Sequence, residues 1–209
     1  MKRILIITMF LLTILTIRTF SQEEPVFKKC DMISGYVEYK VSGTAKGKAE
    51  FFFEEYGLYS SVLEDLNVDT LNKTAQFKNV EISTPDSVYS IDLLKATGTK
   101  SALPDKSKAK ELFEIEKGDF EKVKTQLMKD DGYIKVGNEN ILDKDCTIWE
   151  LNANGSTTKI WVWKGIELKI LMKSDEYELS QVAIRFVEEE PIPFSKFEPP
   201  SGVKWEVTK

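Results

Sequence analysis

The chain has 209 residues, with 29 basic and 34 acidic side chains, two cysteines and no histidine, and its formal net charge is −5. The lack of histidine excludes Ser-His-Asp and Cys-His catalytic sites and every histidine-ligated metal centre. Arginine occurs only at Arg3, Arg18 and Arg185. Because phosphate is normally bound by arginine, we expect no nucleotide and no nucleic acid as a partner.

Residues 1–21 have the features of a secretory signal peptide. Lys2 and Arg3 precede an uncharged, mostly aliphatic run from Ile4 to Ile17, which is shorter than the ~20 residues that a membrane span needs. Cleavage fits after Ser21, where small residues occur. The sequence therefore predicts an exported protein, periplasmic or secreted, and the alternative is an uncleaved amphiphilic anchor at the N-terminus.

After a short N-terminal segment (22–33), residues 34–209 are expected to form a single domain. No repeat of fixed period and no long Gly/Ser or Pro-rich linker divides this part of the chain. Short runs in which apolar and polar residues alternate are typical of half-buried strands. In the first half of the domain they predict strands over 35–41, 48–54, 59–63 and 88–94.

The period changes to a helical one in an insertion over about 106–130. Asp119 is a plausible N-cap and Gly132 a plausible C-terminal stop for a helix in this insertion. Apolar residues three, seven and eight positions apart form one stripe of that helix, as expected for a helix with one buried face: Phe120, Val123, Leu127 and Met128.

The clearest strand patterns follow the insertion, over 147–151, 158–163, 166–172 and 177–188. Asn154-Gly155 and Lys164-Gly165 separate consecutive strands and favour tight hairpin turns. About nine strands joined by short turns predict a mainly antiparallel β fold. We expect an open, incomplete β-barrel or a strongly curved sheet, with the helix on its concave side as a lid.

Two stretches of sequence resemble known exported proteins. The segment from Phe194 to Val203, which reads FSKFEPPSGV, resembles the C-terminal end of the LolA/LolB lipoprotein-carrier superfamily. Cys146, Trp149 and the run from Trp161 to Lys169 resemble a group of uncharacterised exported bacterial proteins of that fold. The resemblance covers residues from about 34 to 207. It implies a LolA-like unclosed barrel whose apolar cavity lies under a helical lid.

Two features of the carriers are missing from this chain. The carriers hold their lid closed with an arginine on an early strand, whereas no arginine occurs here between Arg18 and Arg185. Their N-terminal lid helix has no counterpart, because residues 22–33 are short and contain Pro25. The resemblance therefore implies the fold more directly than it implies lipoprotein shuttling.

Aromatic residues on different predicted strands are the candidate cavity lining, because large apolar side chains suit an acyl chain. They are Phe51, Phe53, Trp149, Trp161 and Trp163. The candidate lid residues lie in the helical insertion and are Phe113, Phe120, Val123 and Leu127. Two alternatives stay open: the aromatic residues fill a solid core, or they form an exposed protein-binding patch.

The remaining residue types offer little chemistry. Cys30 and Cys146 are a candidate disulfide in an oxidising compartment, worth ~4–5 kcal/mol for so long a loop; the alternative is a buried free Cys146 and a loose Cys30. No acidic residues show a catalytic spacing and no EF-hand pattern occurs, although a loose calcium site in the acidic loops stays open. We expect no cofactor, no metal and no enzymatic activity.

Together these features predict a non-enzymatic exported protein, expected to be a monomer, that binds an apolar ligand in the cavity of a curved sheet. The ligand class is a lipid, an acyl chain or a lipidated protein, with peripheral or transient membrane contact, in the handling of envelope lipids or lipoproteins. The alternative function is a structural or protein-interaction module of the envelope with a filled core and no ligand.

Overall fold

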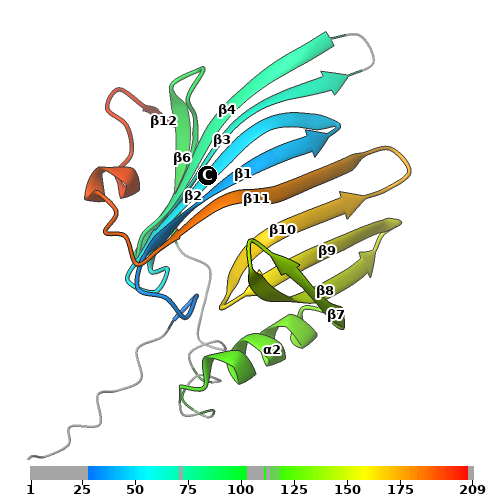
Figure 1. Ribbon diagram of the computed structural model, residues 1–209. Helices are drawn as coiled ribbons and strands as arrows, with labels where there is room; N and C mark the ends of the chain where they lie inside the picture. The colour runs from blue at the N-terminus through cyan, green and yellow to red at the C-terminus, as the bar shows by residue number, and fades with distance from the viewer. Residues whose placement is uncertain are drawn as a thin grey trace, which may run out of the picture.

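The computed structural model of the protein describes residues 28–70, 73–102, 111, 114, 116 and 118–206. Within these residues twelve strands form a single sheet (Figure 1), together with one α-helix, α2 (Phe120–Asp130), and one 3-10 helix, η1 (Phe194–Phe197). The strands are β1 (Gly35–Gly43), β2 (Ala45–Glu54), β3 (Tyr59–Thr70), β4 (Lys73–Ser83), β5 (Ser87–Asp92), β6 (Thr97–Ala102), β7 (Ile134–Ile141), β8 (Lys144–Ala153), β9 (Ser156–Trp163), β10 (Ile166–Lys173), β11 (Glu178–Glu188) and β12 (Lys204–Glu206).

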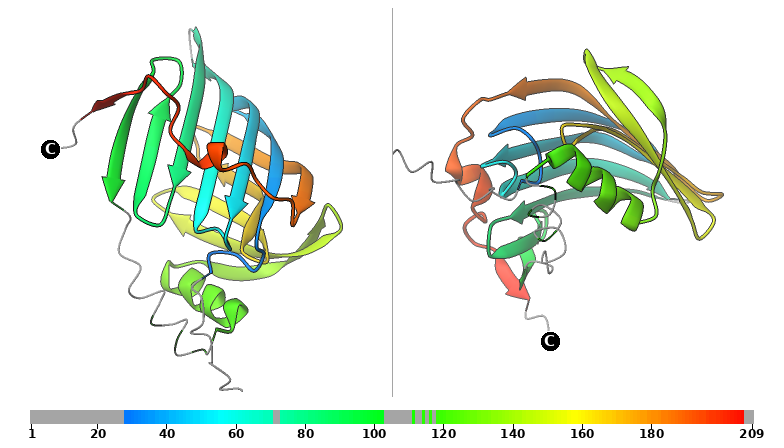
Figure 2. Two further views of the ribbon diagram at one scale, coloured as in Figure 1. Left: turned by 90° about the vertical axis from the view of Figure 1, so that its left-hand side faces the viewer. Right: turned by 90° about the horizontal axis from the view of Figure 1, so that it is seen from below.

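The sheet joins two antiparallel meanders, and its strand order is β12-β6-β5-β4-β3-β2-β1-β11-β10-β9-β8-β7. The first meander runs from β1 to β6 and the second from β7 to β11, and they meet where β1 pairs with β11. Among the described strands, β12 alone is parallel to its neighbour, β6. The sheet is strongly curved and its two edge strands do not meet, so the barrel stays open (Figure 2).

Local sequence explains the hairpins of the second meander. Asn154 and Gly155 have φ angles of 51° and 74°, and Lys164 and Gly165 have φ angles of 47° and 83°. Two consecutive residues with positive φ produce a turn whose twist matches that of the flanking strands. These two turns therefore fix the register of β8 with β9 and of β9 with β10.

The first meander places its larger side chains on both faces of the sheet. We call the face that carries Val37, Tyr39, Phe51 and Phe53 the concave face. Direct pairing of Val37 with Phe51 and of Tyr39 with Ala49 puts them on the same side. Val37, Phe53 and Ala49 are almost completely buried there, so this face holds the larger core of the molecule.

The convex face is covered by the C-terminal segment that contains η1. Phe197 of η1 is buried against Phe52, Ile82 and Ile91, and Tyr59 packs edge-on to Phe194 with ring centroids 5.4 Å apart. Figure 2 shows this segment crossing the outer surface of the first meander. The segment that resembles the LolA/LolB ending therefore seals the outside of the sheet.

Helix α2 packs on one end of the second meander. Its Met128 lies in a small core with Trp149, Ile160 and Val162. The Asp119 side chain caps the helix by accepting a hydrogen bond of 3.2 Å from the backbone N–H of Lys122, and the chain turns away at Gly132, whose φ is +86°. Both predicted helix ends are thus confirmed.

The structure confirms a mainly antiparallel, strongly curved open sheet with a helix. The described residues form twelve strands; eight of them correspond to the strand ranges predicted from the sequence, and the alternation pattern does not reveal the other four, β4, β6, β7 and β12. The predicted signal peptide (1–21), much of the N-terminal segment (22–33) and the part of the helical insertion that includes Phe113 lie outside the described residues.

Candidate functional site

A cavity of about 370 Å³ opens on the concave face, between β1–β3 and the β9–β10 hairpin. Five of its lining side chains are mainly apolar: Tyr39, Phe51, Val62, Ile166 and Ile170. Three are polar or charged: Glu64, Glu167 and Gln181. The ninth lining residue is Gly165 of the hairpin turn. The volume lies in the lower part of the range of small-molecule sites.

The cavity exists because β10 and β11 separate. β10 pairs with β11 only from Lys169 to Lys173, so its first residues, Ile166 to Leu168, have no partner on that side. A bulge between Glu167 and Lys169 bends β10 at the same point. Figure 1 shows the two strands diverging there. Without a neighbouring strand, the start of β10 leaves open space beside Tyr39.

Tyr39 bridges this gap. Its hydroxyl donates a hydrogen bond of 2.9 Å to the backbone carbonyl of Glu167, which joins β1 to β10 past the intervening β11. The Tyr39 side chain is 4 % exposed, and its small neighbour on β11 is Ala183. Burial, and next the charge of Glu167, raise the pKa of the Tyr39 phenol far above its usual range, so Tyr39 stays neutral and acts as a hydrogen-bond donor.

The apolar wall follows from strand register. Phe51 pairs directly with Val62 on β3, so the two side chains lie next to each other on the concave face. Phe51 also stacks on Phe53, with ring centroids 5.5 Å apart. Phe51 is half-buried, whereas Phe53 is fully buried. Phe51 therefore contributes surface to the cavity, while Phe53 supports it from behind.

The polar wall is acidic. Glu64 lies beside Ala49 on the concave face and is half-buried. Burial, and next the nearby Glu81, raise the pKa of the Glu64 carboxyl. Neither Glu64 nor Glu167 forms an ion pair with a described residue. Unpaired carboxylates in a half-buried wall are costly to keep charged, which is consistent with the raised pKa of Glu64.

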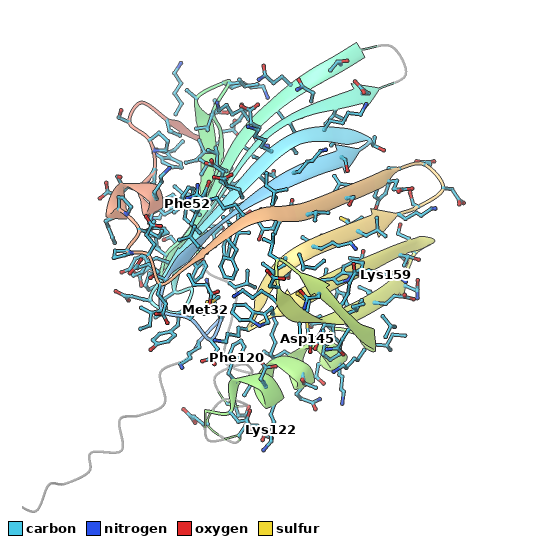
Figure 3. All side chains as sticks on the ribbon, viewed as in Figure 1. Met32, Phe52, Phe120, Lys122, Asp145 and Lys159 are labelled. Carbon is cyan, nitrogen blue, oxygen red and sulfur yellow. The ribbon has the colours of Figure 1, made fainter. Side chains whose placement is uncertain are left out.

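The N-terminal segment holds the bottom of the cavity in place. The backbone N–H of Lys29 donates to the Tyr56 carbonyl and that of Asp31 to the Lys164 carbonyl, each at 2.9 Å. The next residues, Cys30 and Met32, are buried in the core of the concave face. Figure 3 labels Met32 on this segment and Phe120 at the start of α2. This segment thus ties the β2–β3 turn to the β9–β10 turn.

Gly165 is the one cavity residue that must be glycine. Its φ is +83°, and a Cβ there would lie 2.6 Å from Phe120 Cζ and 2.7 Å from the carbonyl oxygen of Lys29. Such contacts are too short for any side chain, and positive φ also disfavours one. The β9–β10 turn, α2 and the N-terminal segment therefore meet at this residue.

Of the five aromatic residues predicted to line a cavity, Phe51 lines the 370 Å³ cavity, and Trp149 lines a smaller hollow of about 100 Å³ beside α2. Trp149 packs under α2. Trp161 donates from Nε1 to Glu139 Oε2 at 2.6 Å, with Lys169 Nζ 4.1 Å from its ring centroid. Trp163 packs edge-on to Phe186, with ring centroids 5.8 Å apart. These tryptophans belong to packed side-chain clusters.

The predicted lid residues lie beside the cavity rather than over it. Phe120 and Val123 are buried and Leu127 is half-buried, but no α2 residue lines the 370 Å³ cavity. Instead α2 borders a smaller hollow of about 100 Å³ with β8 and β9. Phe113 lies outside the described residues. A lid role for these four residues stays a prediction.

Cys30 and Cys146 are free thiols in the structure, and both are buried. Cys30 Sγ lies 3.5 Å from the Met32 carbonyl oxygen, and Cys146 Sγ lies 3.4 Å from the Lys144 carbonyl oxygen. Burial raises the pKa of each thiol to about 11. The structure thus contains the buried free Cys146 that was the alternative to a disulfide, and Cys30 is buried rather than loose.

The sequence does not single out most of the cavity lining. It places Tyr39 on the correct strand and face. It also places Ile166 and Ile170 on the correct strand but on one face, whereas the bulge in β10 shifts the register between them, so that they do not share a face. The separation of β10 from β11, which turns those faces into a cavity wall, depends on a bulge with no sequence marker. Val62 and Glu64 lie in a strand that is longer than predicted.

Other kinds of site have less support. No helix among the described residues is both long enough and apolar enough to cross a membrane. The same residues contain no group of three or more Cys, Asp or Glu side chains placed to bind a metal ion.

Comparison with known proteins gives structural similarities only. No protein-family model matches the chain, and no curated protein matches its sequence. An uncharacterised conserved protein from Thermus thermophilus is 9% identical, with a TM-score of 0.49 over 83% of this chain and 90% of that chain. MucB, in the MucA/MucB complex of Pseudomonas aeruginosa, is 11% identical, with a TM-score of 0.41 over 80% of this chain and 56% of that chain.

A third similar structure is LprF from Mycobacterium bovis, 10% identical, with a TM-score of 0.34 over 82% of this chain and 93% of that chain. The chain spans little more than half the length of the MucB chain. At TM-scores below 0.5 these similarities carry no argument about function.

Proposed function

We propose that this protein binds the apolar chain of a lipid, an acyl chain or a lipidated protein in the cavity on the concave face. The observation that carries the proposal is the 370 Å³ cavity itself, whose walls include Phe51, Val62, Ile166 and Ile170. Burying ten methylene groups there would contribute ~8 kcal/mol before ordering costs, at ~0.8 kcal/mol for each. The proposed role is non-enzymatic.

The proposed setting is the cell envelope, outside the cytoplasm. It is supported by the signal-peptide pattern of residues 1–21 and by the similarity of the ending FSKFEPPSGV to the LolA/LolB superfamily. In such a setting, a monomer with an open half-barrel would take up an apolar chain during transient contact with a membrane or a lipidated protein. The lid role of Phe113, Phe120, Val123 and Leu127 belongs to this proposal.

The test uses N-phenyl-1-naphthylamine, an uncharged fluorophore that brightens in apolar surroundings. We expect saturable binding of one probe per chain, reversed by dodecanol. Val62→Trp fills the cavity and should weaken probe binding by at least about tenfold. Ile184→Trp is the matched control, because Ile184 is 53% exposed and lies outside the cavity.

The control variant should bind the probe as the unmodified chain does, and thermal melting of both variants establishes that they are folded. A folded protein that shows no saturable probe signal contradicts the proposal. That result would support the second candidate function, a structural or interaction module whose cavity takes no ligand.

A further inference from the structure

The apolar cavity continues into a second, polar hollow. This hollow measures about 200 Å³ and shares Val62 and Glu64 with the cavity. Beyond them it is lined mainly by Asn79, Glu81 and Ser90, on β4 and β5. The two hollows adjoin at Val62 and Glu64, and the second has the larger share of polar lining residues, which matches a ligand that is apolar at one end and polar at the other.

All charged residues that line the two hollows are acidic. They are Glu64, Glu81 and Glu167, and no lysine or arginine of the described part of the chain lines either hollow. Among the described residues, none of the three carboxylates has an ion-pair partner. The ammonium of Lys29 lies on the same side of the sheet, outside the lining of both hollows, and donates to Ser83 Oγ at 3.1 Å, two residues along β4 from Glu81.

Strand register explains the one-sided charge. Val62 pairs with Glu81 and Glu64 pairs with Asn79, so the two carboxylates are diagonal neighbours on the concave face. Lys78 of β4 falls on the other face, where it forms an ion pair of 3.2 Å with Asp65, and Lys48 of β2 pairs in register with the same Asp65. The alternation of β2 to β4 thus keeps these lysines off the concave face and leaves two acids there unbalanced.

We propose that the ligand is a single-chain amphiphile with a protonated primary amine as its head, the chain in the 370 Å³ cavity and the ammonium beside Glu64 and Glu81. This inference rests on the proposed function and names the ligand class of the same site. An ammonium donates up to three hydrogen bonds and is attracted by both carboxylates. A carboxylate or phosphate head would meet only like charge there.

The raised pKa of Glu64 agrees with this arrangement. Burial and the neighbouring Glu81 disfavour the charged form of the Glu64 carboxyl, so a cation placed between the two acids relieves the repulsion between them. The same unfavourable charge makes an uncharged alcohol a weaker ligand than an amine of equal chain length.

The experiment compares three competitors with the same twelve-carbon chain: dodecylamine, dodecanol and dodecanoate. Each displaces N-phenyl-1-naphthylamine from the full chain at low ionic strength and at concentrations below micelle formation. We expect dodecylamine to displace the probe at a concentration about tenfold lower than dodecanol does, and dodecanoate to be the weakest. Added salt should reduce the preference for the amine.

Glu64→Gln with Glu81→Gln should remove the preference for the amine, so that dodecylamine and dodecanol displace the probe at concentrations within about twofold of each other. Glu189→Gln with Glu190→Gln is the control, because it changes the net charge equally at two exposed residues outside both hollows. Equal displacement by all three competitors, or a preference for dodecanoate, overturns the ammonium inference but leaves apolar binding in place. No displacement by any of them overturns both.

Discussion

The hydroxyl of Tyr39 is the one polar bridge that the described residues show between β1 and the separated start of β10, so its removal should destabilise the protein measurably. Tyr39→Phe removes a buried hydrogen bond of 2.9 Å to the Glu167 carbonyl. A lost intramolecular bond costs ~0.5–1.5 kcal/mol, and a buried carbonyl left without a donor costs more. We expect the free energy of unfolding to fall by about 1–2 kcal/mol, which corresponds to a melting temperature lower by roughly 2–8 °C.

The measurement is urea unfolding followed by tryptophan fluorescence, with thermal melting in parallel. The matched control is Tyr89→Phe, because the Tyr89 hydroxyl forms no hydrogen bond with a described residue and its side chain is half-buried. The control should change stability by less than about 0.5 kcal/mol. If both variants lose the same stability, the Tyr39 bridge does not hold β10 to β1 and the explanation of the cavity wall is wrong.

Three further predictions follow from particular contacts. Asp119→Ala should lower the free energy of unfolding by about 1 kcal/mol, because it removes the N-cap of α2; an unchanged melting temperature would contradict this. Cys30 and Cys146 are free, so thiol titration of the unfolded protein without reductant should find two thiols. In the folded protein the same thiols should react slowly at about pH 8, because burial raises the pKa of each to about 11. No free thiols after unfolding would indicate a disulfide. Because the pKa of Glu64 is raised in the folded protein, folding takes up a proton at this carboxyl, and the free energy of unfolding should fall as the pH rises through the folded-state pKa. The Glu64→Gln variant should lack this fall. If the free energies of unfolding of the variant and the unmodified protein depend on pH in the same way, the prediction is wrong.

The strands that sequence predicts well are those with one consistently buried face. β1 alternates buried Val37, Tyr39 and Val41 with less buried residues. β9 and β10 are bounded by two-residue turns with positive φ, which the sequence marks clearly as Asn154-Gly155 and Lys164-Gly165. Pattern and turn chemistry agree in these regions, so the predicted and observed bounds differ by at most two residues.

The missed strands lack that agreement. In β4 the apolar residues change face midway, because Phe77 faces the concave side while Val80 and Ile82 pack on the convex side. β7 is an edge strand whose side chains are mostly exposed, and Gly137 interrupts its pattern. Alternation cannot identify a strand that has no single buried face.

The candidate site was harder to predict than the fold. The sequence favoured the largest aromatic residues, but Trp149, Trp161 and Trp163 fill gaps between packed elements. The cavity instead arises where backbone pairing ends, and smaller residues such as Val62 and Ile166 line it. Residue size indicates burial, whereas the empty volume depends on how strands diverge, and a single sequence does not contain that information.

The most direct test of an apolar site on the concave face is methyl NMR of protein labelled at isoleucine δ1 methyl groups, titrated with dodecanol. Ile166 and Ile170 line the cavity, whereas Ile82 and Ile91 are buried under the convex face. We predict saturable shifts and ligand contacts at the Ile166 and Ile170 methyls, with Ile82 and Ile91 unchanged. Shifts confined to Ile82 and Ile91, or no saturable shift at any of the four, would contradict an apolar binding site on the concave face.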